Sequence, residues 1–210
     1  MVTRSSAFPL SLLAGCAAFA LWSFAGAPDR VTWWMEASWV LAGVPVLVVT
    51  WKRCPLTPLL YGLLFIHALI LLLGARYTYA EVPLGFWMQD AFGFTRNHYD
   101  RIGHFAQGFV PAILAREILI RNHAVNGRGW LFVLVTGICL AFSAFFEMIE
   151  WWTSAAMGAE ADAFLGSQGD VWDAQWDMFM ALIGAMMAQF SLARLHDQQL
   201  DAGRLPREKT

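Results

Sequence analysis

Six long apolar stretches alternate with short polar segments along the chain. A helix needs about 20 mostly apolar residues to cross the hydrocarbon core of a bilayer, because each residue adds about 1.5 Å of length. The stretches that reach this length occupy approximately residues 8–26, 33–51, 56–75, 102–121, 130–152 and 176–195. The pattern predicts an all-α polytopic membrane protein, in which six transmembrane helices form a single transmembrane domain over 1–210.

The composition agrees with this class. Hydrophobic residues make up 58% and charged residues 14% of the chain, whereas soluble domains carry roughly 25% charged residues. The three cysteines have no paired spacing, which argues against a thiolate metal site or a disulfide framework. The sequence shows no basic patch of the kind that binds nucleic acid. The partners expected from composition are therefore membrane lipids and not nucleic acid.

Lysine and arginine are distributed unevenly between the two sides of the predicted bundle. With the N-terminus in the cytoplasm, ten of the fourteen basic residues fall in cytoplasmic segments. These ten are Arg4, Lys52, Arg53, Arg116, Arg121, Arg128, Arg194, Arg204, Arg207 and Lys209. The loop between Trp152 and Trp176, on the other side, has none. The positive-inside rule therefore predicts that both termini are cytoplasmic.

The segment that precedes the fourth apolar stretch is unusually polar. Residues 97–105 contain two histidines, an aspartate, an arginine and a tyrosine, at the point where lipid should begin. If the chain is helical from Asp100 onward, Asp100, His104 and Gln107 lie on one face. Such a stripe normally turns toward protein or a wet cavity. Upstream, the apolar run 83–88 is predicted to lie along the membrane interface as a short amphipathic segment.

Two other helix ends bring carboxylates to the same side of the membrane. Glu147 and Glu150 lie three residues apart near the end of the fifth stretch, and Asp170, Asp173 and Asp177 lead into the sixth. These spacings place the members of each set on one face of a helix. The sequence therefore predicts a cluster of Asp, Glu and His side chains on the outer side of the membrane, which is the periplasmic side if the membrane is a bacterial inner membrane.

Several carboxylates cannot share a poorly hydrated site as bare anions, so protons or cations must neutralise them. A divalent metal does so efficiently, and oxygen ligands with an imidazole suit Zn, Mn, Fe or Mg. The residues predicted to hold the metal are Asp100, His104, Glu147, Asp173 and Asp177. Glu150 or His98 is predicted to be the general base for a metal-bound water, and Arg101 is predicted to stabilise an anionic substrate or oxyanion.

Less specific interpretations of these residues stay open. Arg101 would also form an interhelical ion pair that fixes packing, and Glu150 would also suit an exposed interfacial position. Asp170 suits a turn or a helix cap, and carboxylates in the first turns of the sixth helix suit the helix dipole. The sequence does not determine whether Glu36 and His67, from the second and third stretches, join the site.

Three motifs lie between residues 97 and 178, within a region of roughly residues 50–195 over which a family resemblance extends. They are Asn97-His98-Tyr99-Asp100-Arg101-x-x-His104-Phe105, Phe146-Glu147-x-x-Glu150-Trp151 and Gly169-Asp170-x-Trp172-Asp173-x-Gln175-x-Asp177-Met178. Together they resemble the YjdF family of bacterial inner-membrane proteins, which implies a six-span inner-membrane protein and no particular activity. The Asp, His and Glu positions of the same motifs bear a weaker likeness to VanZ-like membrane proteins, which points to a role in the cell envelope. Asp177 stands where the VanZ pattern has Asn.

The function predicted from these residues is a metal-dependent enzyme, a metal-assisted hydrolase that acts on a lipid or lipid-linked substrate of the cell envelope. The alternatives are an ion- or proton-coupled transporter and a structural or assembly factor. Intramembrane carboxylates also mark ion paths. A path through the protein needs polar groups in the cytoplasmic half, however, and Arg116-Glu117 is nearly all that the sequence offers there.

Overall fold

Helices make up most of the described chain. The computed structural model describes residues 6–158 and 167–202. Within these ranges the helices are α1 (Ala7–Gly26), α2 (Arg30–Thr50), α3 (Pro58–Tyr77), the 3₁₀ helix η1 (Tyr79–Glu81), α4 (Pro83–Phe92), α5 (Tyr99–Arg121), α6 (Arg128–Met157) and α8 (Asp173–Ala202). The predicted all-α class is confirmed, and a helix lies over each of the six apolar stretches. α6 and α8, at 30 residues each, extend beyond the predicted limits.

Short polar residues start two of the first helices. The Asp29 side chain accepts a hydrogen bond from the backbone N–H of Val31 at the start of α2. At the start of α3 the Thr57 side chain accepts one from Leu60, and Pro58 occupies the first turn. Both arrangements satisfy N–H groups that have no partner within the helix, so the apolar runs begin as helices at these residues.

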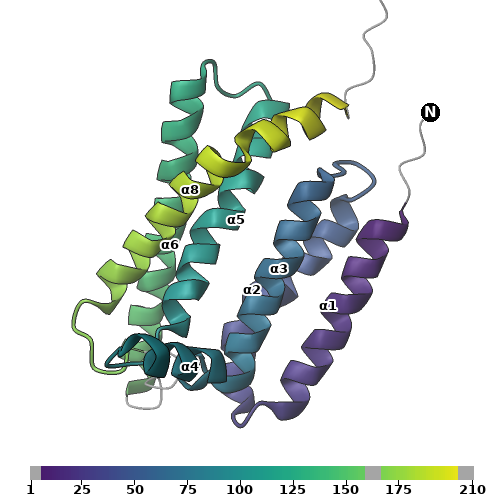
Figure 1. Cartoon of the computed structure of the whole chain (residues 1–210). Helices are drawn as coiled ribbons and strands as arrows, with labels where there is room; N and C mark the ends of the chain where they lie inside the picture. Colours follow the sequence, from purple (N-terminus) through teal and green to yellow (C-terminus); the bar gives the residue numbers. More distant parts are fainter. Residues whose placement is uncertain (1–5, 159–166, 203–210) are drawn as a thin grey trace, which may run out of the picture.

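The long helices form two groups of three. α1, α2 and α3 lie on one side of the bundle, and α5, α6 and α8 lie on the other (Figure 1). Contacts between α3 and α5 join the groups, and Trp39 of α2 places its ring 5.0 Å from that of Phe142 in α6. The end of the bundle that carries α4 is called the α4 end below, and the opposite end is called the distal end.

Five of the described helices are long and apolar enough to cross a membrane, by length and composition: α1, α2, α3, α6 and α8. α5 has 23 residues but carries several buried polar side chains. These are Asp100, Arg101, His104, Gln107, Arg116 and Glu117. α5 contacts α3, α6 and α8, so these neighbours cover the polar groups of the most polar long helix. This agrees with the rule that ionisable groups at membrane depth face protein.

Two glycines allow α5 and α8 to approach each other closely. A Cβ atom at Gly108 of α5 would overlap the carbonyl group of Ala181, and one at Gly184 of α8 would overlap the carbonyl oxygen of Phe105. The atoms in the way are backbone atoms, which cannot move aside as a side chain can. Small residues at such a crossing let two helix backbones pack directly. This contact holds the polar ends of α5 and α8 side by side.

We expect Gly184→Ala to destabilise the bundle, because the added methyl group meets the backbone of α5. Overpacking of this kind costs about 1–3 kcal/mol, which thermal unfolding in detergent would report as a lowered Tm. Gly137→Ala in α6 is the matched control, since a Cβ there meets no atom within 4 Å. Equal melting temperatures for the two variants would show that α5 and α8 are not in direct backbone contact.

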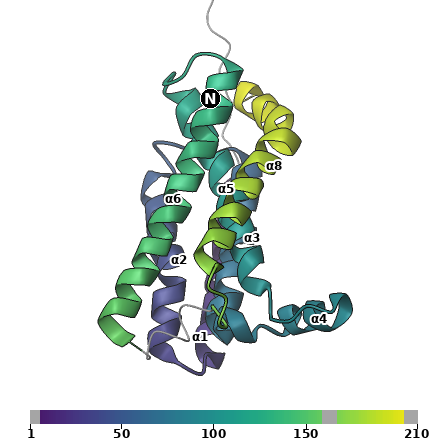
Figure 2. The ribbon, with the colours of Figure 1, turned by 90° about the vertical axis from the view of Figure 1, so that its left-hand side faces the viewer.

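The short helix α4 extends sideways from its end of the bundle (Figure 2). Several of its apolar side chains are exposed, among them Trp87 and Phe92, with 62% and 65% of their surface accessible. Gly93 ends the helix in the left-handed conformation, at φ 68°. Exposed aromatic rings on a helix at the rim of a membrane bundle suit the boundary between lipid and water. The predicted amphipathic segment over 83–88 is therefore a helix with the exposure that this placement requires.

A second polar network lies at the distal end. The Glu117 carboxylate is fully buried and accepts hydrogen bonds from the Thr57 hydroxyl at 2.7 Å and from His196 Nε2 at 3.0 Å. It also pairs with Arg121 at 2.5 Å. Arg116 lies 2.9 Å from His196 Nδ1. Because arginine only donates hydrogen bonds, Nδ1 accepts and Nε2 carries the proton, which makes His196 a neutral link between the two charged groups.

At the distal end the sequence indicated few polar groups beyond Arg116 and Glu117, whereas the structure adds several partners. The partners come from the start of α3 and from the last turns of α8, so they lie 60 and 79 residues from Glu117. In addition, Gln199 of α8 accepts a hydrogen bond from the backbone of Leu59. A charged residue within an apolar stretch signals that partners must exist, but only packing identifies them.

Candidate metal centre and its cavity

Asn97 organises the start of α5. Its side-chain oxygen accepts a hydrogen bond from the N–H of Tyr99, and its side-chain nitrogen donates to the carbonyl of Val82. Its backbone exchanges two hydrogen bonds with the side chain of Gln168, which lies before α8. Asn97 was part of the motif noted in the sequence but was not assigned a role. It ties the start of α5 to the segments that precede α4 and α8.

Asp100, His104 and Asp177 are brought together at the α4 end, all three buried. His104 Nε2 lies 3.5 Å from Asp100 Oδ1 and 3.7 Å from Asp177 Oδ1. One ligand atom from each residue lies within 4.8 Å of the other two. Asp100 and His104 lie on one face of α5, as the sequence predicts. The contact between α5 and α8 brings Asp177 of α8 to the same place.

The spacing of these atoms fits a metal ion. A tetrahedral ion with ligand bonds of about 2.0–2.1 Å separates neighbouring ligand atoms by about 3.4 Å. The distances from His104 to the two aspartates are close to this value. Two carboxylate oxygens and one imidazole nitrogen also form a donor set that Zn, Mn or Fe accepts. Three protein ligands would leave further coordination positions for water or a substrate.

Glu147 lies on the other side of the histidine ring. Its Oε1 atom is 3.8 Å from His104 Nδ1, whereas both aspartates face Nε2. Neither His104 Nδ1 nor Glu147 Oε1 has a hydrogen-bond partner among the described residues. A carboxylate opposite the ligating nitrogen commonly fixes the tautomer and orientation of a metal-bound histidine. The geometry therefore places Glu147, one of the five predicted ligands, behind His104 rather than beside the aspartates.

Asp173, another predicted ligand, is paired with two arginines. Its Oδ1 atom lies 2.6 Å from Arg101 Nη2 and 2.9 Å from Arg96 Nη1. Asp170 accepts from the same guanidinium groups, at 3.3 Å from each, and from the backbone N–H of Trp172. Arg101 also donates to Asp177. The arginines thus neutralise the two aspartates nearer the surface and hold the third in place.

Of the three residues predicted to act on a substrate, Glu150 lies on the wall of a cavity beside the cluster, and Arg101 and His98 do not. Arg101 is bonded to carboxylates as described above. His98 comes just before α5, and its ring stacks edge-on against Phe94 at 4.8 Å. Burial, together with the charges of Arg96 and Arg101, lowers the pKa of His98 below its ordinary value, so the imidazole is neutral near pH 7.

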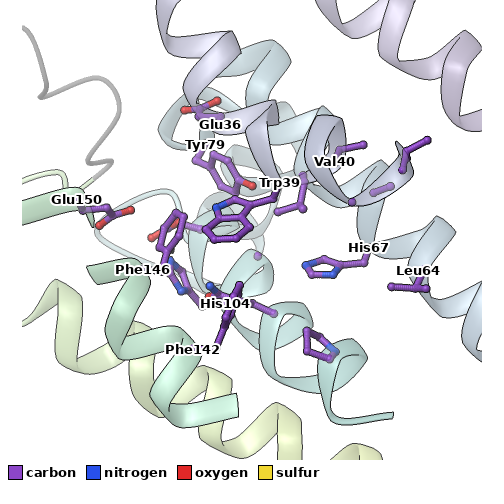
Figure 3. A pocket seen from close by; sticks show the side chains of 18 of the residues that line it. Glu36, Trp39, Val40, Leu64, His67, Tyr79, His104, Phe142, Phe146 and Glu150 are labelled. Atoms are coloured by element: carbon purple, nitrogen blue, oxygen red, sulfur yellow. Dashed lines mark ion pairs between the residues drawn. The ribbon is translucent and has the colours of Figure 1, made fainter. Parts of the chain in front are cut away.

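The cavity has a volume of about 200 Å³ and lies between the two groups of helices. Glu36 and Tyr79 are at one end, and His67 and Leu64 are at the other (Figure 3). Asp100, His104 and Glu150 form part of the same wall. Glu36 and His67, which the sequence left unassigned, thus line the same cavity as Asp100 and His104. The rest of the wall is mostly apolar.

These features define a class of protein: an all-helical, multi-pass membrane protein with a buried cluster of ionisable groups at one end. Comparison with known proteins agrees. The chain belongs to the family described as "Predicted membrane protein (DUF2238)", whose model matches residues 8–198. It is 49% identical over 200 residues to the inner membrane protein YjdF of Escherichia coli (strain K12), covering 95% of this chain and 93% of that protein. No solved structure matches the chain.

The resemblance to the YjdF family is therefore confirmed, and the protein is a multi-pass protein of the bacterial inner membrane. The family description and the relative's name assign no activity.

Proposed function

We propose that the protein is a metal-dependent hydrolase that acts on a lipid or lipid-linked substrate of the cell envelope. One observation carries this proposal: Asp100, His104 and Asp177 present ligand atoms within 4.8 Å of one another, and the first two also line a largely apolar cavity inside the bundle. A metal site that opens onto an apolar cavity suits a substrate with a hydrocarbon part and a reactive polar part.

The residues take distinct roles in this proposal. Asp100, His104 and Asp177 bind the metal, and Glu147 orients the imidazole of His104 from its far side. A divalent ion at such a site lowers the pKa of bound water and polarises a carbonyl or phosphoryl oxygen. Glu150, on the cavity wall, is the general base for that water. Arg101 positions Asp177 through its hydrogen bond.

The proposed topology has six spans and both termini in the cytoplasm. The five apolar helices and α5, which lies among them, make an even number of crossings. The α4 end then faces the periplasm, and the distal end, with Arg116, Arg121 and Arg128, faces the cytoplasm. Several of the basic residues behind this assignment, including Arg4 and Arg204, lie outside the described residues.

A coupled transporter is less well supported, because an apolar layer separates the two polar networks. Arg116 follows His104 by twelve residues along α5, or about 18 Å at 1.5 Å per residue. Ala112 and Ile113, in this interval, are fully buried. A purely structural cluster is the stronger rival, since a protonated His104 would also satisfy the surrounding carboxylates. Measurement of bound metal separates that case from the proposed one.

We expect the purified protein to contain close to one equivalent of a divalent metal, measured by elemental analysis after dialysis against Zn, Mn and Mg in turn. We expect Glu150→Gln to keep this metal and to lose hydrolysis by about 10²–10⁴-fold, the usual contribution of a general base. Hydrolysis would be followed as products released from radiolabelled inner-membrane lipids. Absence of metal from the folded wild-type protein, or equal turnover by the variant, would overturn the proposal.

A further inference from the structure

The Glu36 carboxylate is the least expected group in the cavity. It belongs to α2, only 6% of its surface is accessible, and neither of its oxygens has a hydrogen-bond partner among the described residues. Burial of an acceptor without a donor is costly, and native structures seldom leave one unsatisfied. Both oxygens lie at the polar end of the cavity, beside Tyr79 (Figure 3). A donor supplied by a ligand would resolve this cost.

The charges around Glu36 restrict the kind of donor. Asp100 and Glu150 line the same cavity. Among the described residues, those that line it include no lysine or arginine. No lysine or arginine among the described residues of the wall is paired with Glu36, so a ligand that carries its own positive charge is favoured beside this carboxylate. A primary ammonium group brings a positive charge and three N–H donors, which suits a carboxylate with two free oxygens.

The remainder of the cavity continues as an apolar space. A second cavity of about 290 Å³ lies between α1, α2 and α3. Val44, Leu47, Leu64 and Ala68 line both cavities, so the two are adjacent. The second is bounded by side chains such as Leu13, Val48 and Phe65. Together the two volumes fall within the roughly 300–1,000 Å³ typical of ligand pockets.

The dimensions match one hydrocarbon chain. Along α2, Val44 lies eight residues from Glu36 and Trp51 lies fifteen, which correspond to about 12 Å and 22 Å at 1.5 Å per residue. One leaflet of the hydrocarbon core is about 15 Å thick, half of the full 30 Å. A chain that begins near Glu36 would therefore pass Val44 and enter the second cavity. A polar group at one end and an apolar path of this length describe an amphiphile.

We propose that the two cavities bind a membrane lipid with a primary ammonium head group, its nitrogen at Glu36 and one acyl chain in the space lined by Val44 and Ala68. As a binding site the proposal stands on the cavities alone. As the substrate class of the hydrolase it rests on the proposed function. The second chain of a diacyl lipid remains outside, among the surrounding lipids.

The test uses native mass spectrometry of the delipidated protein with three synthetic lipids that share the same acyl chains. Phosphatidylethanolamine has the ammonium N–H donors, phosphatidylcholine has the positive charge without them, and phosphatidylglycerol has neither. We expect binding in that order, with at least a tenfold difference between the first and the last. Glu36→Gln should reduce this difference to less than threefold. Equal or stronger binding of phosphatidylglycerol by the wild-type protein would overturn the head-group assignment.

The position of the acyl chain is tested by placing a bulky side chain in the cavity that would hold it. Ala68→Phe should lower binding of phosphatidylethanolamine at least tenfold, and Val44→Phe serves the same purpose if the first variant does not fold. Ala42→Phe is the matched control, because Ala42 is exposed on α2 and lines neither cavity. If a folded Ala68→Phe or Val44→Phe variant binds phosphatidylethanolamine as tightly as the wild type, the acyl chain does not occupy this cavity.

The metal-dependent hydrolase and the lipid-binding site can be tested independently of each other. Asp177→Asn should lose metal but keep the preference for phosphatidylethanolamine, because Asp177 does not line the cavity. A protein without metal that still prefers this lipid would refute the hydrolase and retain the lipid site. A protein with metal that binds the three lipids equally would refute the lipid site and retain the metal centre.

Discussion

Asp177→Asn should weaken metal binding by more than about 100-fold, since loss of a residue that merely supports a ligand already costs about 10–100-fold. The aspartate is buried in α8, and its Oδ1 atom lies 3.7 Å from His104 Nε2. An amide in its place keeps the size of the side chain but loses the negative charge that binds a cation. Titration with Zn, followed by elemental analysis of the protein after gel filtration, measures the change.

Asp170→Asn is the matched control. Asp170 also bonds to Arg101, but it is not among the three residues whose ligand atoms converge. Its replacement should leave metal affinity within about threefold of the wild type, well below the loss caused by removal of even a supporting residue. If the wild type and Asp177→Asn bind metal equally well, the ion lies at a site that does not include Asp177. Equal losses in the two variants would indicate an electrostatic effect of the whole acidic cluster.

Glu117→Gln should lower the free energy of unfolding by about 1–3 kcal/mol, the usual cost of leaving a buried hydrogen-bonding group without its partner. The Glu117 side chain has no accessible surface and receives donors from Thr57, His196 and Arg121. The amide nitrogen of glutamine cannot accept a hydrogen bond, so at least one of these donors loses its acceptor. Unfolding in mixed micelles, followed by far-ultraviolet circular dichroism, would report the loss.

Asp197→Asn provides the comparison within the same network. Asp197 pairs with Arg116 at 2.8 Å, but 43% of its side-chain surface is accessible. Exposed ion pairs contribute about 0–1 kcal/mol, because water and salt screen them. We therefore expect a large effect from the buried residue and a small one from the exposed residue. Similar small effects from both would mean that the distal network does not stabilise the contact between α3, α5 and α8.

Local features of the chain were sufficient to predict most of the helices. Apolar runs of membrane length coincide with helices in the structure because hydrophobic surface and backbone hydrogen bonding act over neighbouring residues. The i,i+4 pair Asp100 and His104 was also predictable, since helical periodicity alone places these residues on one face. The helix ends were less predictable: α8 continues past its apolar core, and polar residues near its two ends, such as Asp173 and Gln199, find partners on other helices.

The arrangement across helices could not be derived in this way. Asp173 and Asp177 lie one turn apart on the same face of α8, and both were predicted to bind metal. Arg96, in the segment before α5, reaches Asp173 but not Asp177 in the described contacts. Glu147 and Asp177 approach opposite nitrogens of one imidazole. Periodicity defines the face of a helix, but the neighbour that occupies that face depends on where helices cross.

The sequence by itself determined the all-helical membrane class, the family and the concentration of carboxylates near three helix ends. These properties depend on composition and on spacing within single helices. Only the tertiary structure decided which carboxylates meet His104, which are neutralised by arginine, and that Glu117 meets His196 79 residues away. The close contact between α5 and α8 at Gly108 and Gly184 brings these side chains within reach of one another. Distances between helices depend on packing of the whole bundle, which no local pattern encodes.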